Sequence, residues 1–175
     1  MSVDEGVTRW LRQLEAGDQD AARLLWQRYY RELVELARPL PVTFHRAIDL
    51  CRDSAEALET LAGMGVARIL TSGRKATALE GAQCIADLVR RSLGYPGRIT
   101  VMAGGGITAD NLPALLAATG VSEVHFSARE PLASPMTYRN LGCHMGKAYT
   151  PDEYTRKITT AEKVRIVVES GRRAL

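Results

Sequence analysis

The stretch PVTFHRAID (residues 41–49) has the form of a short β-strand that ends in polar residues, and three similar stretches follow it. They are ARILTS (67–72), ITVMAGGG (99–106) and EVHFSAR (123–129), each rich in Val, Ile or Phe and each followed by an amphipathic helical pattern. Their starts recur roughly every 24 to 32 residues, which is the spacing of strand–helix units in a parallel sheet. We therefore predict an α/β fold with about four parallel βα units, a partial (β/α)₈ TIM barrel.

The composition is that of an ordinary globular protein, with 175 residues of which 46% are hydrophobic and 25% are charged. There is no apolar run as long as a membrane span and no signal-peptide pattern at Met1–Glu5, so we expect a cytoplasmic protein without a membrane partner. Cys51, Cys84 and Cys143 are too widely separated to form a CxxC pair or a disulfide framework. A net charge of +3 is too small to indicate a nucleic-acid partner.

Residues 1–38 differ in pattern from residues 39–175, and we predict a domain boundary near Arg38. Leucines and aromatic residues recur at helical spacing on both sides of Gly17, which predicts a helical hairpin whose first helix ends near Ala16. The sequence Pro39-Leu40-Pro41 then breaks the second helix.

Parts of this hairpin, Val7–Leu11, Ala16–Asp18 and Tyr29–Ala37, resemble the start of an extracytoplasmic-function sigma factor. That resemblance implies a regulatory module that contacts RNA polymerase. The segments with which such factors melt and read promoter DNA have no counterpart here. The alternative is an amphipathic hairpin that packs on the barrel fragment or on another copy of the chain.

The later helices carry recognisable start and stop signals. Asp53, Thr77 and Thr159 each precede a Glu by three residues, as in a capping box, and Asp110 is the expected cap of the third helix. Gly65, Gly94 and Gly120 are expected to end helices in the left-handed conformation.

Alternation along the strands predicts which side chains face the barrel interior. In the last strand His125, Ser127 and Arg129 would face the interior or its mouth. In the first strand Thr43 and His45 would point inward, with Arg46 and Asp49 at the rim. Two histidines, arginines and hydroxyl groups are thus predicted to converge at the strand ends, where barrel enzymes hold their ligands.

The run Gly104-Gly105-Gly106 leads from the third strand into a helix, and its backbone can approach a ligand closely. We predict a phosphate or carboxylate site between residues 105–107 and 127–129. Thr71 and Ser72 add hydroxyl groups at the neighbouring strand end. The alternatives are that the glycines only form a tight turn and that Thr71 and Ser72 only stabilise their own turn.

The sequence gives weaker support to three other kinds of chemistry. His45 and His125, with Cys51 or Met102, offer ligands for soft Cu(I), as does the local run Cys143-His144-Met145, but none has metal-site spacing. No nucleophile motif is present and no lysine lies on a predicted strand. A barrel isomerase or lyase acting on a phosphorylated small molecule, with His45 or His125 as general base, is the alternative function, and whether the chain is an enzyme stays open.

The sequences VTFHRAID, ARILTSG, MAGGGIT and TGVSEVHFSAR, in this order, resemble the C-terminal half of the CutC family. The resemblance implies a cytoplasmic TIM barrel with a role in copper homeostasis and copper binding. Cysteines that this family is thought to use for copper lie in a first half that has no counterpart here. The site residues carried over with the matching sequences are His45, Arg46, Asp49, Thr71, Ser72, Gly104, Gly105, Gly106, His125, Ser127 and Arg129.

Half a barrel has a physical deficit that a whole barrel lacks. Four parallel strands leave two open edges with unpaired backbone groups, and they leave the inner side of the sheet uncovered. We therefore expect a homo-oligomer in which a second copy completes eight strands. The alternatives are a chain in which the N-terminal hairpin covers the gap, and a poorly stable chain that aggregates.

Overall fold

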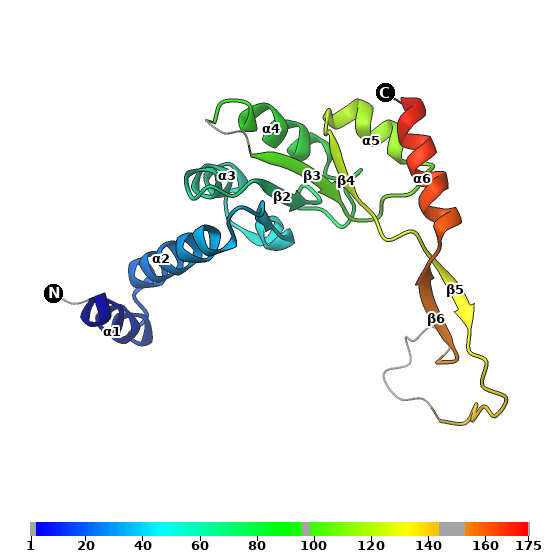
Figure 1. Ribbon diagram of the computed structural model, residues 1–175, viewed down its shortest axis with the longest axis horizontal. Helices are drawn as coiled ribbons and strands as arrows, with labels where there is room; N and C mark the ends of the chain where they lie inside the picture. Colours follow the sequence, from blue (N-terminus) through cyan, green and yellow to red (C-terminus); the bar gives the residue numbers. More distant parts are fainter. Residues whose placement is uncertain (1–2, 96–98, 144–152, 175) are drawn as a thin grey trace.

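A four-stranded parallel sheet forms the centre of the protein (Figure 1). The computed structural model describes residues 3–95, 99–143 and 153–174. The strands lie in the order β1 (Thr43–Phe44), β2 (Arg68–Thr71), β3 (Thr100–Gly104) and β4 (Glu123–His125), each parallel to its neighbour. Between them run the 3₁₀ helix η1 (Arg46–Leu50) and the helices α3 (Ser54–Gly63), α4 (Ala82–Ser92) and α5 (Leu112–Thr119). The predicted four-unit parallel α/β fold is confirmed.

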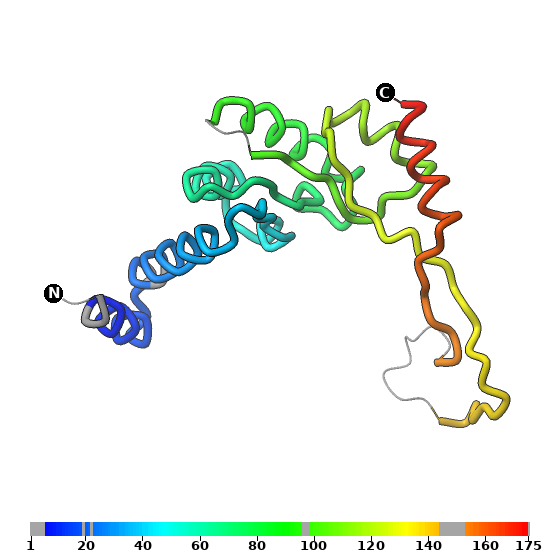
Figure 2. Tube along the Cα trace, in the orientation of Figure 1, coloured from blue at the N-terminus to red at the C-terminus, as the bar shows by residue number. Residues whose placement is uncertain are grey.

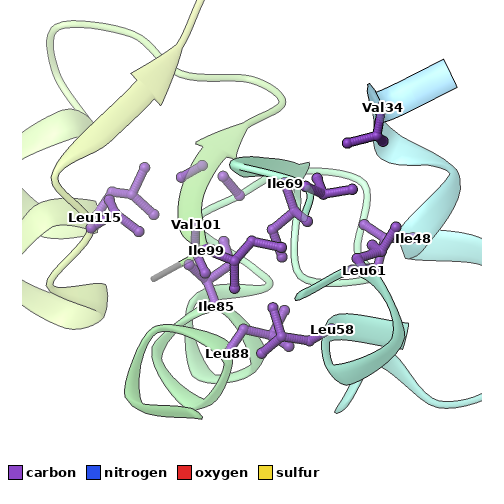
Figure 3. Close-up of a cluster of buried hydrophobic side chains, with 14 residues drawn as sticks. Val34, Ile48, Leu58, Leu61, Ile69, Ile85, Leu88, Ile99, Val101 and Leu115 are labelled. Atoms are coloured by element: carbon purple, nitrogen blue, oxygen red, sulfur yellow. The ribbon is translucent and has the colours of Figure 1, made fainter. Parts of the chain in front are cut away.

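The hydrophobic core lies between the sheet and these helices (Figure 3). Ile69 and Val101 point into it from β2 and β3, and they pack among leucine and isoleucine side chains from the covering helices. The fully buried members of that set include Leu58, Ile85, Leu88 and Leu115. Burial of these side chains provides most of the stabilisation of the fold.

None of the helices in residues 3–95, 99–143 and 153–174 covers the opposite side of the sheet (Figure 1). Alternation places on it the strand residues that lie next to the buried ones, and all of them are exposed or half-buried. We call this side the inner face, and it consists of Thr43, His45, Arg68, Leu70, Thr100, Met102, Glu123 and His125.

The N-terminal hairpin consists of α1 (Val3–Glu15) and α2 (Gln19–Ala37), as predicted. Asp18 caps α2 by accepting from the backbone amides of Asp20 and Ala21 at 2.9 and 3.3 Å. The hairpin joins the core through α2: Val34 is buried in the core cluster, and Trp26 and Tyr30 stack 4.6 Å apart beside Phe44. These contacts lie on the core side of β1, so they leave the inner face uncovered.

The prediction of one strand over residues 123–129 is wrong beyond His125. Ala128 has φ of 45°, which an extended strand does not allow. From there β5 (Arg129–Ala133) pairs antiparallel with β6 (Thr155–Thr159), and this hairpin projects away from the sheet (Figure 2). The described residues after Arg38 therefore form a four-stranded parallel sheet with its helices, followed by an antiparallel arm and a last helix.

The last helix, α6 (Ala161–Ala174), returns from the arm and packs on α5. Val167 is buried there, and the Ser170 hydroxyl donates to the backbone oxygen of Ala109 at 2.6 Å. None of the helices in the described part of the chain is long and apolar enough to cross a membrane.

The helix signals were mostly read correctly. Asp53 accepts from the amides of Ala55 and Glu56, and Thr77 and Glu80 bond reciprocally. The last helix is capped by Thr160, which accepts from the Lys163 amide, and not by Thr159. Gly65 and Gly120 have φ of 81° and 66°, whereas Gly94 does not have a positive φ, so the prediction of a left-handed helix end there is wrong. Asp110 is not the cap of α5, however, because a turn precedes that helix. There Asn111 accepts from the amide of Thr108 at 2.9 Å and donates to the Gly106 oxygen at 2.8 Å.

Candidate functional site

A polar cluster occupies the carboxyl ends of β1 and β2. Arg46 and Asp49 come from η1, and Thr71 and Ser72 come from the end of β2 and the loop after it. His45 begins η1 by accepting the amide of Ala47 at its Nδ1, 3.0 Å away. Because η1 has about three residues per turn, Arg46 and Asp49 lie on the same side of it. We call Arg46, Asp49, Thr71 and Ser72 the strand-end cluster.

Asp49 is the centre of this cluster, and its side chain is only 7% exposed. Its carboxylate accepts from the hydroxyls of Thr71 (2.6 Å) and Ser72 (3.0 Å) and from the amides of Ser72 (3.0 Å) and Arg74 (3.1 Å). Burial alone would raise the pKa of Asp49, but these hydrogen bonds and the one from Arg46 lower it to about 2. Asp49 is therefore ionised at neutral pH and holds residues 71–74 in place.

Arg46 is held by the same cluster but keeps one nitrogen available. Its Nε donates to Asp49 at 2.9 Å, and its Nη2 donates to the Ser72 hydroxyl and to the Lys75 backbone oxygen. Within the described residues, Nη1 makes no hydrogen bond. The side chain as a whole is 44% exposed.

The glycine run of the third strand meets this arginine. A Cβ on Gly105 would lie 3.4 Å from Arg46 Nη1 and 3.2 Å from the Ser72 Cβ, and its φ is 115°. Only glycine adopts that conformation without strain and leaves this space open. The backbone of the loop and the arginine therefore border the same small volume.

The loop after β2 borders the same volume through its backbone. The Arg74 amide donates to Asp49, and the Lys75 backbone oxygen accepts from Arg46. Arg74 has φ of 64°, an uncommon value for a residue other than glycine, and the hydrogen bond from its backbone amide to Asp49 stabilises this conformation. The available nitrogen of Arg46 would favour an anion here.

The two predicted histidines lie on the inner face at the same end of the strands but on opposite edges of the sheet. His45 follows β1 and His125 ends β4, and two strands separate them. Strands are spaced about 4.8 Å apart, so the two strands are about 14 Å apart. Within one chain the two histidines cannot hold one ligand atom.

The remaining predicted residues are spread over three places. Gly104 lies beside His125, where an added Cβ would be 3.3 Å from that side chain, and Gly106 lies against Thr77. The backbone oxygen of Ser127 accepts from the Thr159 hydroxyl at 2.8 Å. Arg129 begins the projecting arm, and Arg46 is the arginine that lies beside Gly105. The anion site between residues 105–107 and 127–129 stays a prediction.

The described residues do not fit a copper centre. No three His, Cys, Asp or Glu side chains gather among them. Burial raises the pKa of the Cys51 thiol, and its sulfur donates to the Ile48 oxygen at 2.8 Å, whereas a cysteine binds a metal as the thiolate. His144 and Met145 of the Cys143–Met145 run lie outside the described residues.

One feature of the inner face was missed from the sequence. Arg68 donates from Nε and Nη2 to the two carboxylate oxygens of Glu123, the latter at 3.0 Å, and from Nη1 to the Thr43 hydroxyl at 3.2 Å. The alternation that turns Thr43 inward also turns Arg68 inward, so the sequence ARILT (67–71) could have predicted that Arg68 lies on the inner face.

Comparisons with known proteins agree with this fold. The family model described as the CutC family matches residues 11–130. The chain is 48% identical over 133 residues to the "Copper homeostasis protein cutC homolog" of Mus musculus, covering 76% of this chain and 48% of that one. It is 44% identical over 140 residues to the CutC family protein of Bacteroides fragilis, with 80% and 55% coverage.

The solved structure of CutC from Streptococcus agalactiae superposes with a TM-score of 0.51 at 30% identity, covering 57% of this chain and 48% of that one. The chain thus spans about half the length of the relatives it matches. The family match begins inside α1, and the boundary near Arg38 and the sigma-like character of residues 1–38 stay predictions. Matched by the family model over residues 11–130 and by named members at 44–48% identity, the chain belongs to the CutC family.

Proposed function

We propose that the chain binds a small anion, a phosphate or a carboxylate, at the strand-end cluster, and that it serves copper homeostasis through this site. The copper connection is taken from relatives named as copper homeostasis proteins. The described residues support a ligand site for an anion better than they support direct copper coordination, because the one half-buried thiol next to the cluster, Cys51, is held protonated.

The observation that carries the proposal is the orientation of Arg46. Asp49 and Ser72 fix the guanidinium, and its remaining nitrogen borders Gly105. A guanidinium that is already ordered loses little conformational freedom on binding and offers strong charge-assisted hydrogen bonds.

His45 supports anion binding more than proton abstraction. Its Nδ1 accepts the Ala47 amide, so the proton of the neutral ring is on Nε2, which is then a donor. A general base needs an available lone pair instead. The isomerase or lyase alternative therefore has less support from this geometry.

The test is thermal unfolding in phosphate, sulfate or citrate against chloride at equal ionic strength. We expect the anions to raise the unfolding temperature as ligands of the native state do. Arg46→Gln should abolish the increase, and Arg52→Gln, which removes a 93%-exposed arginine, should keep it. Equal responses of the two variants, or no response beyond chloride, would refute the proposal.

A parallel titration separates the anion site from copper. The protein competes with a chromogenic chelator for Cu(I), and Cys51→Ser is compared with the unmodified chain. We expect the Cys51 substitution to leave copper uptake unchanged. A loss of uptake in that variant would show that Cys51 is a ligand despite its hydrogen bond to Ile48.

A further inference from the structure

The inner face and the two edges of the sheet both lack a partner within the described residues. Parallel sheets normally have both faces covered, either by helices or by closure into a barrel. Here α3, α4 and α5 cover one face, and nothing in the described chain covers the other (Figure 1). The edge strands β1 and β4 each have only one neighbour.

The charges of the inner face favour a partner without net charge. Arg68 and Glu123 are its two formally charged residues, and they neutralise each other through two hydrogen bonds. A buried ion is tolerated when it is paired and hydrogen-bonded, and is costly when it is alone. Two such faces can therefore pack together without leaving an unpaired charge.

The number of strands indicates what that partner is. Closure of a (β/α)₈ barrel needs eight parallel strands, and this chain supplies four while spanning about half the length of its relatives. A second copy supplies the other four with the correct direction and the same helix layer.

We propose that two copies of this chain close around their inner faces into one eight-stranded parallel barrel. A twofold axis along the barrel places each β4 edge beside the partner's β1 edge, so all four open edges are paired. The strand-end clusters of both copies then lie at one mouth of the barrel.

The closure also unites the two histidines. His45 follows β1 and His125 ends β4, so the seam places His45 of one copy and His125 of the other on neighbouring strands. Each anion site then gains a histidine from the second copy. Only this added role of His125 rests on the proposed function; the closure itself does not.

A competing surface exists on α2. Trp26, Tyr29, Leu33 and Leu36 are 43–82% exposed and recur at a three-and-four spacing along one stripe of the helix. This stripe could join copies side by side and leave the barrel open. The experiment must therefore distinguish the two surfaces.

Light scattering coupled to size-exclusion chromatography gives the mass of the full chain. We expect a dimer, converted to a folded monomer by Met102→Glu on the inner face and retained in Leu36→Glu on the α2 stripe. Circular dichroism checks that each variant is folded. A monomeric parent chain, or a dimer lost in Leu36→Glu and kept in Met102→Glu, would overturn the proposal.

Cross-linking tests the seam without a destabilising charge. In a Cys143→Ser background, His45→Cys and His125→Cys chains are mixed, allowed to exchange and oxidised. We expect a covalent dimer in the mixture and far less in either chain alone, since β1 and β4 of one chain are too far apart for a disulfide. A dimer by mass that gives no excess of cross-linking in the mixture would contradict the barrel seam.

Discussion

The two faces of the sheet have opposite characters although their residues alternate along the same strands. On the helix side Ile69 is fully buried, whereas its neighbour Leu70 on the inner face is only half-buried. One face thus has the packing of a finished core, and the other is largely polar and partly accessible to solvent among the described residues. A sheet can therefore have a complete hydrophobic core on one side while its other side stays open.

The largest contrast is expected from truncating neighbouring residues on the two faces. Ile69→Ala should lower the free energy of unfolding by about 2–5 kcal/mol because it leaves a cavity in the core. Leu70→Ala should cost clearly less in the monomer because solvent already reaches that side chain. Urea unfolding at high dilution measures both, and equal losses would show that the faces are not different.

Asp49 should have the next largest effect. Asp49→Asn replaces an acceptor of several hydrogen bonds with a group that carries its own donors, and we expect a loss of about 1–3 kcal/mol. Asp53→Asn is the matched control, because asparagine caps a helix about as well as aspartate and Asp53 is exposed. Urea unfolding at neutral pH compares them; a larger loss in the control would remove Asp49 from the centre of the site.

The pH dependence follows from the same carboxylate. The pKa of Asp49 is lowered from 3.8 to about 2 in the folded protein, so its contribution is fully present above 3.8 and is lost as pH falls through about 2. Acid titration of stability should therefore be flatter between these values in Asp49→Asn than in the parent chain. Identical slopes would mean that Asp49 is not specifically stabilised as an ion.

The smallest effect is expected for the ion pair of the inner face. In the monomer, exposed pairs of this kind contribute only about 0–1 kcal/mol, so Arg68→Met with Glu123→Met should change unfolding little at high dilution. Either single substitution should be more costly at concentrations where two copies associate, because it leaves one charge unpaired in the interface. A double-mutant cycle at two protein concentrations measures the coupling free energy between Arg68 and Glu123. The same coupling free energy at both concentrations would argue that the pair stays in solvent.

The sequence was informative wherever a local rule determined the structure. The regular spacing of the strand-like stretches and their polar ends predicted the parallel sheet. The alternation of side chains along a strand placed Thr43 and His45 on the inner face. The strand-end cluster was predicted because η1 follows β1 directly and the β2 end lies next to it. The path after His125 was not predictable, because the positive φ of Ala128 and the pairing of β5 with a segment about 26 residues later are not local properties.

The interaction of Arg46 with Gly105 was also beyond the sequence. Arg129 and Arg46 both follow predicted strands, and only the three-dimensional arrangement shows which of them reaches the glycine loop. The sequence predicted that Arg46 and Asp49 would lie close to Thr71 and Ser72, but it did not indicate that Arg46 would lie beside Gly105.

Hydrogen exchange at the two edge strands tests the central claim most directly. If two copies close the barrel, the amides of the peptides that contain Thr43–Phe44 and Glu123–His125 should exchange more slowly as protein concentration rises. Exchange in the α3 core helix should change much less. Edge amides that exchange at the same rate at every concentration would contradict the account, since they would show that β1 and β4 remain open.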